Sequence, residues 1–329
     1  MCTPAIARLI EGAADLVCAR GEGPHWCGPS PLAPYLRESI GPAALLEGRL
    51  HPWLELSAHS YLAGGGSTQH RQNRRRIEIV LGTFAMTVWA IEVLDDLVDG
   101  DRPESGRQAP NLALYLIGDG HRLLSTLPPR AASQLHAYWS DQWVRWASAQ
   151  AQDVAIASGE KGGGGATGAL AVAEGCGLVT RWGTEAAAIA AGATLGVRDA
   201  LARFGQHLGT AEKILHDLND VWPGPTFCRD LGRSTAQMGT SLPLALALDA
   251  GLLAGGCLHD PRVALVTEEA RLLLLQRGVL HHAWAYADHY RLLAAQALHD
   301  LERVGGDAAM LEPLLNLPTD LCALDVQDP

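Results

Sequence analysis

The sequence predicts an all-α protein. Apolar residues recur at helical spacing along most of the 329-residue chain, and no segment shows the alternation that is typical of strands. Two groups of carboxylates each close an apolar helical segment, so acidic side chains are expected at the ends of two helices. Hydrophobic residues make up 48% of the chain, which is ample for a sizeable core, and no internal repeat of about 20 to 50 residues emerges.

The expected helices follow from apolar periodicity and from the glycines and prolines between them. The first covers residues 4–18 and ends at a loop rich in glycine and proline. The second covers about 36–60, with interruptions near Pro42 and Pro52, and the third runs without proline over about 69–98. Further helices are expected at 112–127, 131–158 and 170–195, in the segment that Pro223 ends, at 242–253 and 267–296, and near Leu311.

The first carboxylate group has the form DDxxD and stands at the end of the 69–98 helix. Asp95 and Asp99 are four residues apart and stack on one helix face, while Asp96 lies about 100° round the axis beside them. Carboxylates this close repel one another unless cations lie among them. Magnesium suits the task, because it takes few protein carboxylates and completes its shell with water and substrate phosphate oxygens. The pattern indicates a magnesium site, and a solvated acidic helix end is the alternative.

The second carboxylate group closes the segment Lys213–Asp220, in which Asp217 and Asp220 are three residues apart on one helix face. Two helix faces that carry carboxylates and point at each other would clamp a diphosphate through bridging metal ions. The two groups therefore make chemical sense together.

With these two groups the chain resembles the trans-isoprenyl diphosphate synthases, also called polyprenyl synthetases, from about Tyr61 to about Leu248. Flanking segments add to the resemblance. Phe204–Gly209 is similar to the family's FGxxLG, Arg229–Arg233 followed by Ser241–Leu244 is similar to its DLxxGKxTLPL, and Gly118-Asp119 resembles its AGD.

The resemblance implies a single-domain, isoprenoid-synthase-type helical bundle around a central active-site cavity. Residues 1–35 are then an N-terminal helix and loop, and 36–329 form the helical domain. It also implies about three Mg²⁺ ions bound with the diphosphate of an allylic prenyl diphosphate substrate. Arg181 and Lys213 are the expected diphosphate-binding cations. The implied catalytic and metal-binding residues are Asp95, Asp96, Asp99, Asp217 and Asp220.

The chain departs from the family at residues that bind isopentenyl diphosphate in chain-elongating members. Gly64-Gly65-Gly66 is followed by Ser67-Thr68 where a GGKR segment is expected, and Met86–Trp89 contains no histidine. Glu104-Ser105-Gly106 stands in place of Arg-Arg-Gly, and Gly239 in place of a later lysine. Each missing charge-assisted hydrogen bond would contribute about 1.5–3 kcal/mol. The carboxylates that the family uses to ionise the allylic substrate are present, whereas the cationic residues that bind isopentenyl diphosphate are missing.

Three hypotheses follow. The first is a terpene synthase that ionises a C15 or C20 allylic diphosphate and releases diphosphate without isopentenyl diphosphate, giving a cyclised or hydroxylated product. The second is a prenyltransferase, either a chain elongator with substitute cations or an enzyme with a non-standard acceptor such as a peptide tryptophan. The third is a non-catalytic subunit, against which the intact carboxylates argue. His216 stands where the second motif has its first aspartate, which departs from both enzyme patterns.

Net charge, cysteine content and hydropathy limit the partners and the cellular compartment that can be expected. The formal net charge is −11 and no basic patch is visible, so nucleic acid is not expected as a partner. The seven cysteines form no CxxC pair, which favours reduced thiols and a cytoplasmic location. No uncharged apolar run of membrane-spanning length occurs, so no membrane span is expected. A homodimer is left open.

Four further patterns have a commoner structural explanation. The arginines in Arg71–Arg76 are expected to form a solvated first turn rather than a phosphate site. The glycine-rich segment 161–168 lacks the order of a phosphate loop and is expected to be a connector. Tryptophans at 139, 143 and 146 indicate core packing more than a cavity that stabilises a cation, and histidines at 281, 282 and 289 indicate an exposed helix face more than a metal site.

Overall fold

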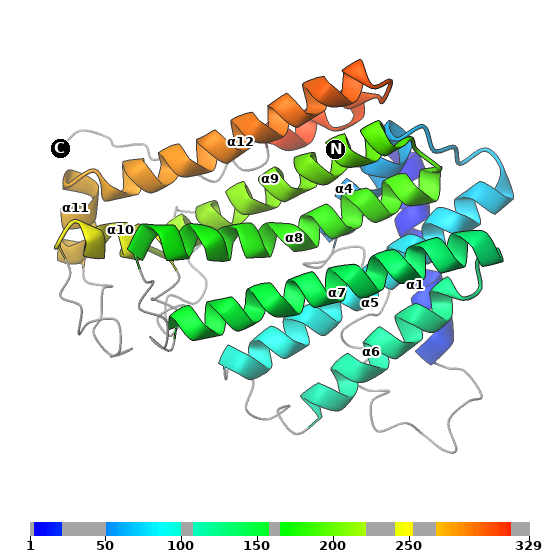
Figure 1. The fold of residues 1–329 in the computed structure, drawn as a ribbon, viewed down its shortest axis with the longest axis horizontal. Helices are drawn as coiled ribbons and strands as arrows, with labels where there is room; N and C mark the ends of the chain where they lie inside the picture. Colours follow the sequence, from blue (N-terminus) through cyan, green and yellow to red (C-terminus); the bar gives the residue numbers. More distant parts are fainter. Residues whose placement is uncertain are drawn as a thin grey trace. The chain divides into compact units, whose positions relative to one another are not determined.

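The computed structural model describes residues 3–21, 51–99, 108–157, 165–221, 241–252 and 268–316. Within these ranges the chain forms α-helices and two short 3-10 helices and no strand (Figure 1), which confirms the all-α prediction. The helices are α1 (Pro4–Gly21), α4 (His51–Ala63), α5 (Arg71–Asp99), α6 (Ala109–Leu124), α7 (Pro129–Ala157), α8 (Gly165–Ala191), α9 (Leu195–Val221), α10 (Leu242–Asp249), α11 (Glu268–Gln276) and α12 (Val279–Arg303), followed by η3 (Ala308–Met310) and η4 (Glu312–Asn316).

The chain divides into two compact units. The first comprises Met1–Gln142, Trp182–Ala202 and Leu298–Leu311, and the second comprises Trp143–Arg181, Arg203–Ala297 and Glu312–Pro329. Helices α7, α8, α9 and α12 contribute residues to both units. The domain boundary predicted between residues 35 and 36 lies outside the described residues.

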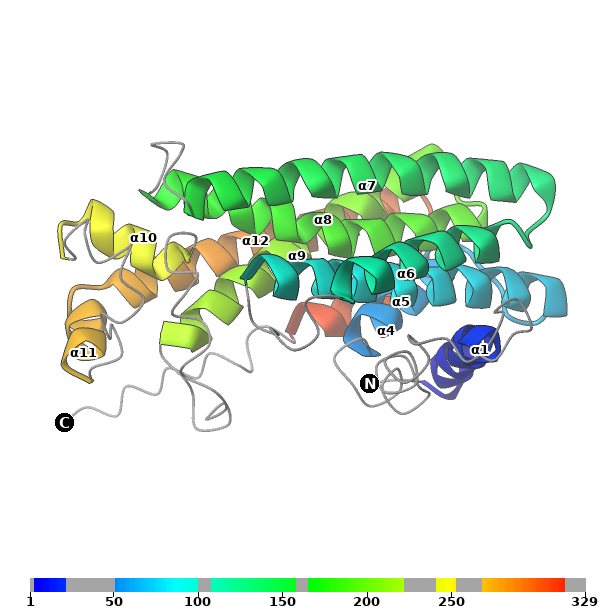
Figure 2. The same ribbon diagram turned by 90° about the horizontal axis from the view of Figure 1, so that it is seen from below.

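The first unit is built around α5, against which α1, α4 and α6 pack (Figures 1 and 2). Gly82 lies midway along α5, and a Cβ atom there would come within 3.3 Å of side-chain atoms of both Val17 and Leu123. The missing side chain therefore lets α1 and α6 approach the same turn of α5. The helix is continuous through this glycine, so the first acidic motif stands at the end of one unbroken 29-residue helix.

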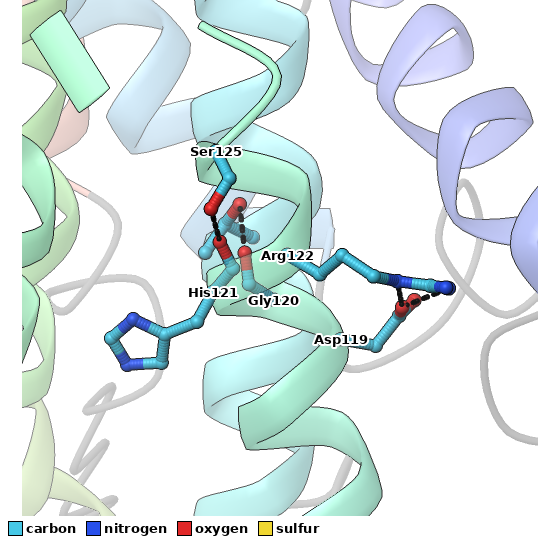
Figure 3. Close-up of polar contacts among 6 residues, drawn as sticks. Asp119, Gly120, His121, Arg122 and Ser125 are labelled. Atoms are coloured by element: carbon cyan, nitrogen blue, oxygen red, sulfur yellow. Dashed lines mark hydrogen bonds and ion pairs between the residues drawn. The ribbon is translucent and has the colours of Figure 1, made fainter. Parts of the chain in front are cut away.

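Polar contacts fix α6 within the first unit (Figure 3). The Thr83 hydroxyl on α5 donates to the carbonyl oxygen of Gly120 at 3.4 Å. Asp119, which is buried, accepts a hydrogen bond of 2.7 Å from Nε of Arg122 one helical turn later. Asp119 belongs to the segment that resembles the family's AGD, and its observed role is to hold an arginine of its own helix.

The aromatic stripe on α7 is explained by packing. Trp139 is buried in the first unit, where its indole N–H donates to Thr87 Oγ1 at 2.9 Å and its ring meets Trp182 edge to face at 5.7 Å. Trp143 and Trp146 are half-buried in the second unit and contact each other edge to face. The core-packing interpretation is confirmed for Trp139.

The second unit has a core contributed by α8, α9, α10, α11 and α12. Close approach of α8 and α9 depends on glycine. A Cβ atom on Gly177 would lie 2.5 Å from the carbonyl oxygen of Gln206, and one on Gly209 would lie 2.8 Å from Cβ of Thr180. Larger residues at these positions would push the two helices apart, and α9 carries the second acidic motif.

Three predicted helix boundaries are wrong. The helix expected over 170–195 ends at Ala191, that expected over 242–253 ends at Asp249, and that expected over 267–296 is two helices, α11 and α12. In each case a glycine adopts a left-handed conformation, with φ of 75° at Gly192, 67° at Gly251 and 73° at Gly278. A residue with that backbone angle ends a helix, and glycine adopts it without steric cost.

Helix α5 is the helix in the described residues that is long and apolar enough, by length and composition, to cross a membrane. Of its most apolar window 72% is buried inside the protein. A core helix buried on most sides has the same composition as a membrane span, and the burial explains the apolar run.

Gly183 on α8 provides a test of this packing. A Cβ atom there would lie 2.6 Å from the ring of the buried Phe84 and would also collide with Ser57. We expect Gly183→Ala to lower the free energy of unfolding by about 1–3 kcal/mol, as overpacking does. Gly118→Ala on α6 is the control, because nothing lies within 4 Å of its Cβ position and alanine favours a helix by up to about 1 kcal/mol. Urea unfolding followed by circular dichroism measures both, and an equal effect of the two variants would contradict the packing.

Candidate active site

The first acidic motif lies at the C-terminal end of α5 in the first unit. Asp95 and Asp96 are half-buried, and Asp99 is the last residue of the helix. The helical conformation confirms that Asp95 and Asp99 are one turn apart on the same face, as their spacing predicted. The side chain of Asp99 is outside the described residues.

The second motif is organised around Asp217 on α9, whose side chain is 3% exposed. Its Oδ1 atom lies 2.9 Å from Nζ of Lys213, one turn earlier on the same helix. Its Oδ2 atom accepts a hydrogen bond of 3.2 Å from the backbone N–H of Leu242, the first residue of α10. Both oxygens of this buried carboxylate therefore have a donor.

The contact with Leu242 satisfies the start of α10. The first N–H groups of a helix have no partner within it, and Ser241 at the N-cap makes no side-chain hydrogen bond there. Pro243 has no N–H to satisfy. A carboxylate at this position also interacts favourably with the helix dipole. Leu242 and Pro243 belong to the segment that resembles the family's TLPL, so this part of the resemblance has a structural role.

Lys213 is held charged by its surroundings. Burial lowers the pKa of this amine, but the charge of Asp217 outweighs burial, and the pKa lies well above its usual range. Cys176 on α8 and Asp153 on α7 act in the same direction. Neither residue was singled out from the sequence, because they come from different helices and no linear spacing links them to Lys213.

His216 extends the second motif outward. Its Nδ1 atom lies 3.4 Å from Oδ2 of Asp220, and ligand atoms of His216, Asp217 and Asp220 all lie within 4.8 Å of one another. The hydrogen bond with Asp220 raises the pKa of His216, although burial acts in the opposite direction. His216 therefore occupies a position next to the acids, where the family has its first aspartate.

The donor set at the second motif fits a hard divalent cation in part. Asp217 and Asp220 offer carboxylate oxygens, which magnesium prefers, whereas the imidazole of His216 suits softer metals. Asp217 already accepts two hydrogen bonds, but each carboxylate oxygen retains lone-pair capacity for another partner. The carboxylates of both motifs are thus suitable magnesium ligands, and His216 is the least suitable of the group.

The structure brings Lys213, Asp217, Asp220 and Arg181 into the second unit, with Arg181 half-buried on α8. Asp95 and Asp96 belong to the first unit. The arrangement of the two motifs across a common cavity, and the diphosphate contacts of Arg181, stay predictions.

The structure corrects one argument about the acceptor. Gly64-Gly65-Gly66 and Ser67-Thr68 precede α5, whereas Asp95 is 24 residues after the first residue of that helix. At 1.5 Å per residue the two ends are about 36 Å apart. The missing lysine and arginine at 67 and 68 therefore say nothing about ligands around Asp95. Of the other segments in the acceptor argument, Met86–Trp89 lies within α5, whereas Glu104-Ser105-Gly106 and Gly239 lie outside the described residues.

The exposure predicted from sequence is confirmed for three of the four arginines at the start of α5 and for the histidines of α12. Arg71, Arg74 and Arg75 are exposed in the first turns of α5, and Arg76 is half-buried. Histidines 281, 282 and 289 are exposed on α12, as expected of a solvated helix face. Of the glycine-rich segment 161–168, residues 161–164 lie outside the described residues, and α8 begins at Gly165.

Comparison with solved structures identifies the fold. The geranylgeranyl pyrophosphate synthetase of the archaeon Geoglobus acetivorans is similar over 96% of this chain and 98% of its own, with 18% identity and a TM-score of 0.71. The geranylgeranyl pyrophosphate synthase of Lactobacillus brevis matches over 96% and 97%, with 17% identity and a TM-score of 0.74. A polyprenyl synthase of Caulobacter crescentus, solved with calcium and isoprenyl diphosphate, matches over 95% and 96%, with 17% identity and a TM-score of 0.72.

The chain therefore has the fold of the isoprenyl diphosphate synthases, and the predicted isoprenoid-synthase-type fold is confirmed. Neither protein-family models nor curated proteins match the sequence. At identities of this size the structural likeness establishes the fold, and the activity is a separate question.

The two bonds of Asp217 predict an unequal effect of removing the motif's carboxylates. Asp217→Asn leaves Lys213 without its close counter-charge and weakens the cap on α10, so we expect the free energy of unfolding to fall by about 1–3 kcal/mol. Asp220→Asn is the control, because Asp220 is 32% exposed and should change stability by about 0.5 kcal/mol or less. Urea unfolding without added metal measures both. Equal losses would show that Asp217 has no special structural role.

Proposed function

We propose that this protein is a magnesium-dependent enzyme of the polyprenyl synthetase family that ionises an allylic prenyl diphosphate. The observation that carries the proposal is the second motif, in which a charged lysine and two aspartates lie together on α9 within the fold of prenyl diphosphate synthases. A half-buried lysine held beside two aspartates is not expected at a merely solvated helix end. It is useful where a diphosphate must be held.

The chain's own residues account for binding and for charge. Asp95, Asp96, Asp99, Asp217 and Asp220 would hold magnesium, which supplies positive charge to the leaving diphosphate when it is bound. Lys213 stays protonated at any physiological pH, because Asp217 raises its pKa, and can donate to a diphosphate oxygen. Arg181 is proposed as a second donor. The apolar residues that dominate α5 exclude water from the bond that breaks.

The proposed fate of the allylic cation is capture by the substrate's own double bond or by water, without isopentenyl diphosphate. Support comes from Glu104-Ser105-Gly106 and Gly239, which replace cationic residues expected to bind that acceptor. The turns before Asp95 also lack a histidine. Met86 and Val88 are buried among the helices of the first unit, and the hydroxyl of Thr87 between them accepts a hydrogen bond from Trp139.

Chain elongation is the second candidate, and specific observations favour it. The similar solved structures are geranylgeranyl or polyprenyl synthases by their descriptions. In addition, the lack of basic residues after Gly64-Gly65-Gly66 is not evidence against binding of isopentenyl diphosphate near Asp95, because this segment lies at the far end of α5. Before the first motif, a glycine directly precedes a basic residue at Gly48-Arg49, which lies outside the described residues.

The expected setting of the enzyme is the cytoplasm. Support comes from the seven cysteines, which form no CxxC pair in the sequence. The proposed partner is the prenyl diphosphate substrate, without nucleic acid and without a membrane span.

Removing a carboxylate of the first motif should abolish turnover and spare the fold. We expect Asp95→Ala or Asp99→Ala to lower the rate of diphosphate release from an allylic diphosphate on the order of 10²-fold or more. Stability should change little or rise, because these carboxylates repel one another without metal. Asp15→Ala is the control, because Asp15 is an exposed carboxylate on α1 in the same unit. If either variant released diphosphate at nearly the wild-type rate with saturating magnesium, the proposal that these carboxylates bind catalytic magnesium would be wrong.

The acceptor is tested by product analysis. Purified protein is incubated with magnesium and each of the C10, C15 and C20 allylic diphosphates, with and without labelled isopentenyl diphosphate. We expect the C15 or C20 substrate to release diphosphate at the same rate in both cases and to give a cyclised or hydroxylated product. Label in a longer linear prenyl diphosphate, formed as fast as the substrate is lost, would establish the elongator instead. In that case Arg49→Ala should raise the KM for isopentenyl diphosphate more than that for the allylic substrate.

A further inference from the structure

The first turns of α5 form one wall of a pocket with a volume of about 620 Å³. Arg71, Arg75 and Arg76 line it from one face of the helix, together with Gln72 and Ile79. The opposite wall is Thr126–Pro128, the connection between α6 and α7. All of these residues belong to the first unit.

Three arginines and no acidic residue line the pocket. Glu78 is the nearby acid, and it pairs with Arg74 at 3.5 Å and reaches Arg75 only at 3.8 Å. Arg76 donates a long hydrogen bond of 3.4 Å to the carbonyl oxygen of Ala190, and its buried Nε atom has no partner among the described residues. No ion pair within the described ranges involves Arg71 or Arg76. The net charge of the lining is therefore strongly positive.

The arginine charges are also repelled by the dipole of α5. The N-terminal end of an α-helix carries partial positive charge, so basic residues in the first turns are unfavourable there and acidic residues are favoured. The first turn of α5 contains no acidic residue, and four of its first six residues are arginine. An anion in the pocket would offset both the mutual repulsion of the arginines and their repulsion by the helix dipole.

The pocket is separate from the proposed catalytic carboxylates. Arg76 and Asp95 are 19 residues apart on one continuous helix, which corresponds to about 28 Å along its axis. A side chain at the start of α5 cannot reach a diphosphate held at the end of α5.

We propose that this pocket is a second anion site, which binds a phosphate or diphosphate group independently of the catalytic carboxylates and of magnesium. The arginine guanidinium groups would form charge-assisted and bidentate hydrogen bonds to phosphate oxygens, the geometry for which arginine is suited. Ile79, Leu127 and Pro128 provide an apolar wall, so a phosphate ester with a short apolar body fits the pocket better than a bare anion. The source of the phosphate group is either a free small molecule or the headgroup of an anionic phospholipid.

Binding in the presence of a chelator tests the proposal. EDTA removes the magnesium-dependent binding at the carboxylates. Calorimetric titration of the full chain with inorganic diphosphate, and with the C5 ester dimethylallyl diphosphate, then measures magnesium-free binding, and the arginine variants assign it to this pocket. We expect saturable binding of the wild type and a Kd about tenfold or more higher for Arg71→Ala and for Arg75→Ala. Arg74→Ala is the matched control, because Arg74 is exposed on the same turns and pairs with Glu78 but does not line the pocket.

Vesicles distinguish the two sources. Flotation with phosphatidylcholine vesicles that contain phosphatidylglycerol should show binding that depends on Arg71 and Arg75 if the ligand is a lipid headgroup, and no binding if it is a free molecule. The proposal is overturned if neither form of phosphate binds in EDTA, or if Arg74→Ala weakens binding as much as the pocket variants. Circular dichroism on every variant shows whether a loss of binding is a loss of fold. The outcome does not depend on the proposed enzymatic activity, which is measured with magnesium.

Discussion

The interaction on which the rest of the candidate site depends is the pair formed by Lys213 and Asp217. A buried carboxylate is costly unless hydrogen bonds or an opposite charge compensate it, and Asp217 has both. Through Leu242 it also satisfies the start of α10, so the acidic motif and the next helix of the core are coupled. The carboxylate that would bind metal is therefore also part of the fold of the second unit.

The two acidic motifs thus differ in physical character. The first motif places three carboxylates, those of Asp95, Asp96 and Asp99, close together at the end of α5. In the absence of metal these carboxylates repel one another. The second motif already contains a compensating cation in Lys213 and a histidine whose pKa is raised by Asp220. The first motif is expected to depend strongly on added metal for its order and charge balance, whereas the second is expected to be largely formed before metal binds. This division would let the protein fold with an incomplete site.

Much of the fold could be predicted, because apolar spacing in α5, α7 and α9 reflects burial that the structure confirms. The breaks at Gly192 and Gly278 could not, since a glycine within an apolar run shows its left-handed conformation only through the backbone angle. The pairing of Asp217 with Lys213 follows from their four-residue spacing, but its contact with Leu242 spans 25 residues and needs coordinates. The argument that Gly64–Gly66 marks a lost acceptor site also failed for lack of coordinates. This segment precedes α5, whereas Asp95 is near the other end of that long helix.

The central claim is that the two acidic motifs hold one diphosphate through shared magnesium. A crystal structure of the protein with magnesium and a non-hydrolysable thiolodiphosphate analogue of a C15 or C20 substrate tests it most directly. The account predicts metal ions coordinated by Asp95 or Asp99 and by Asp217 or Asp220, with Lys213 within hydrogen-bonding distance of the analogue's diphosphate. Metal and diphosphate bound at one motif alone, with the carboxylates of the other motif in contact with neither, would contradict it.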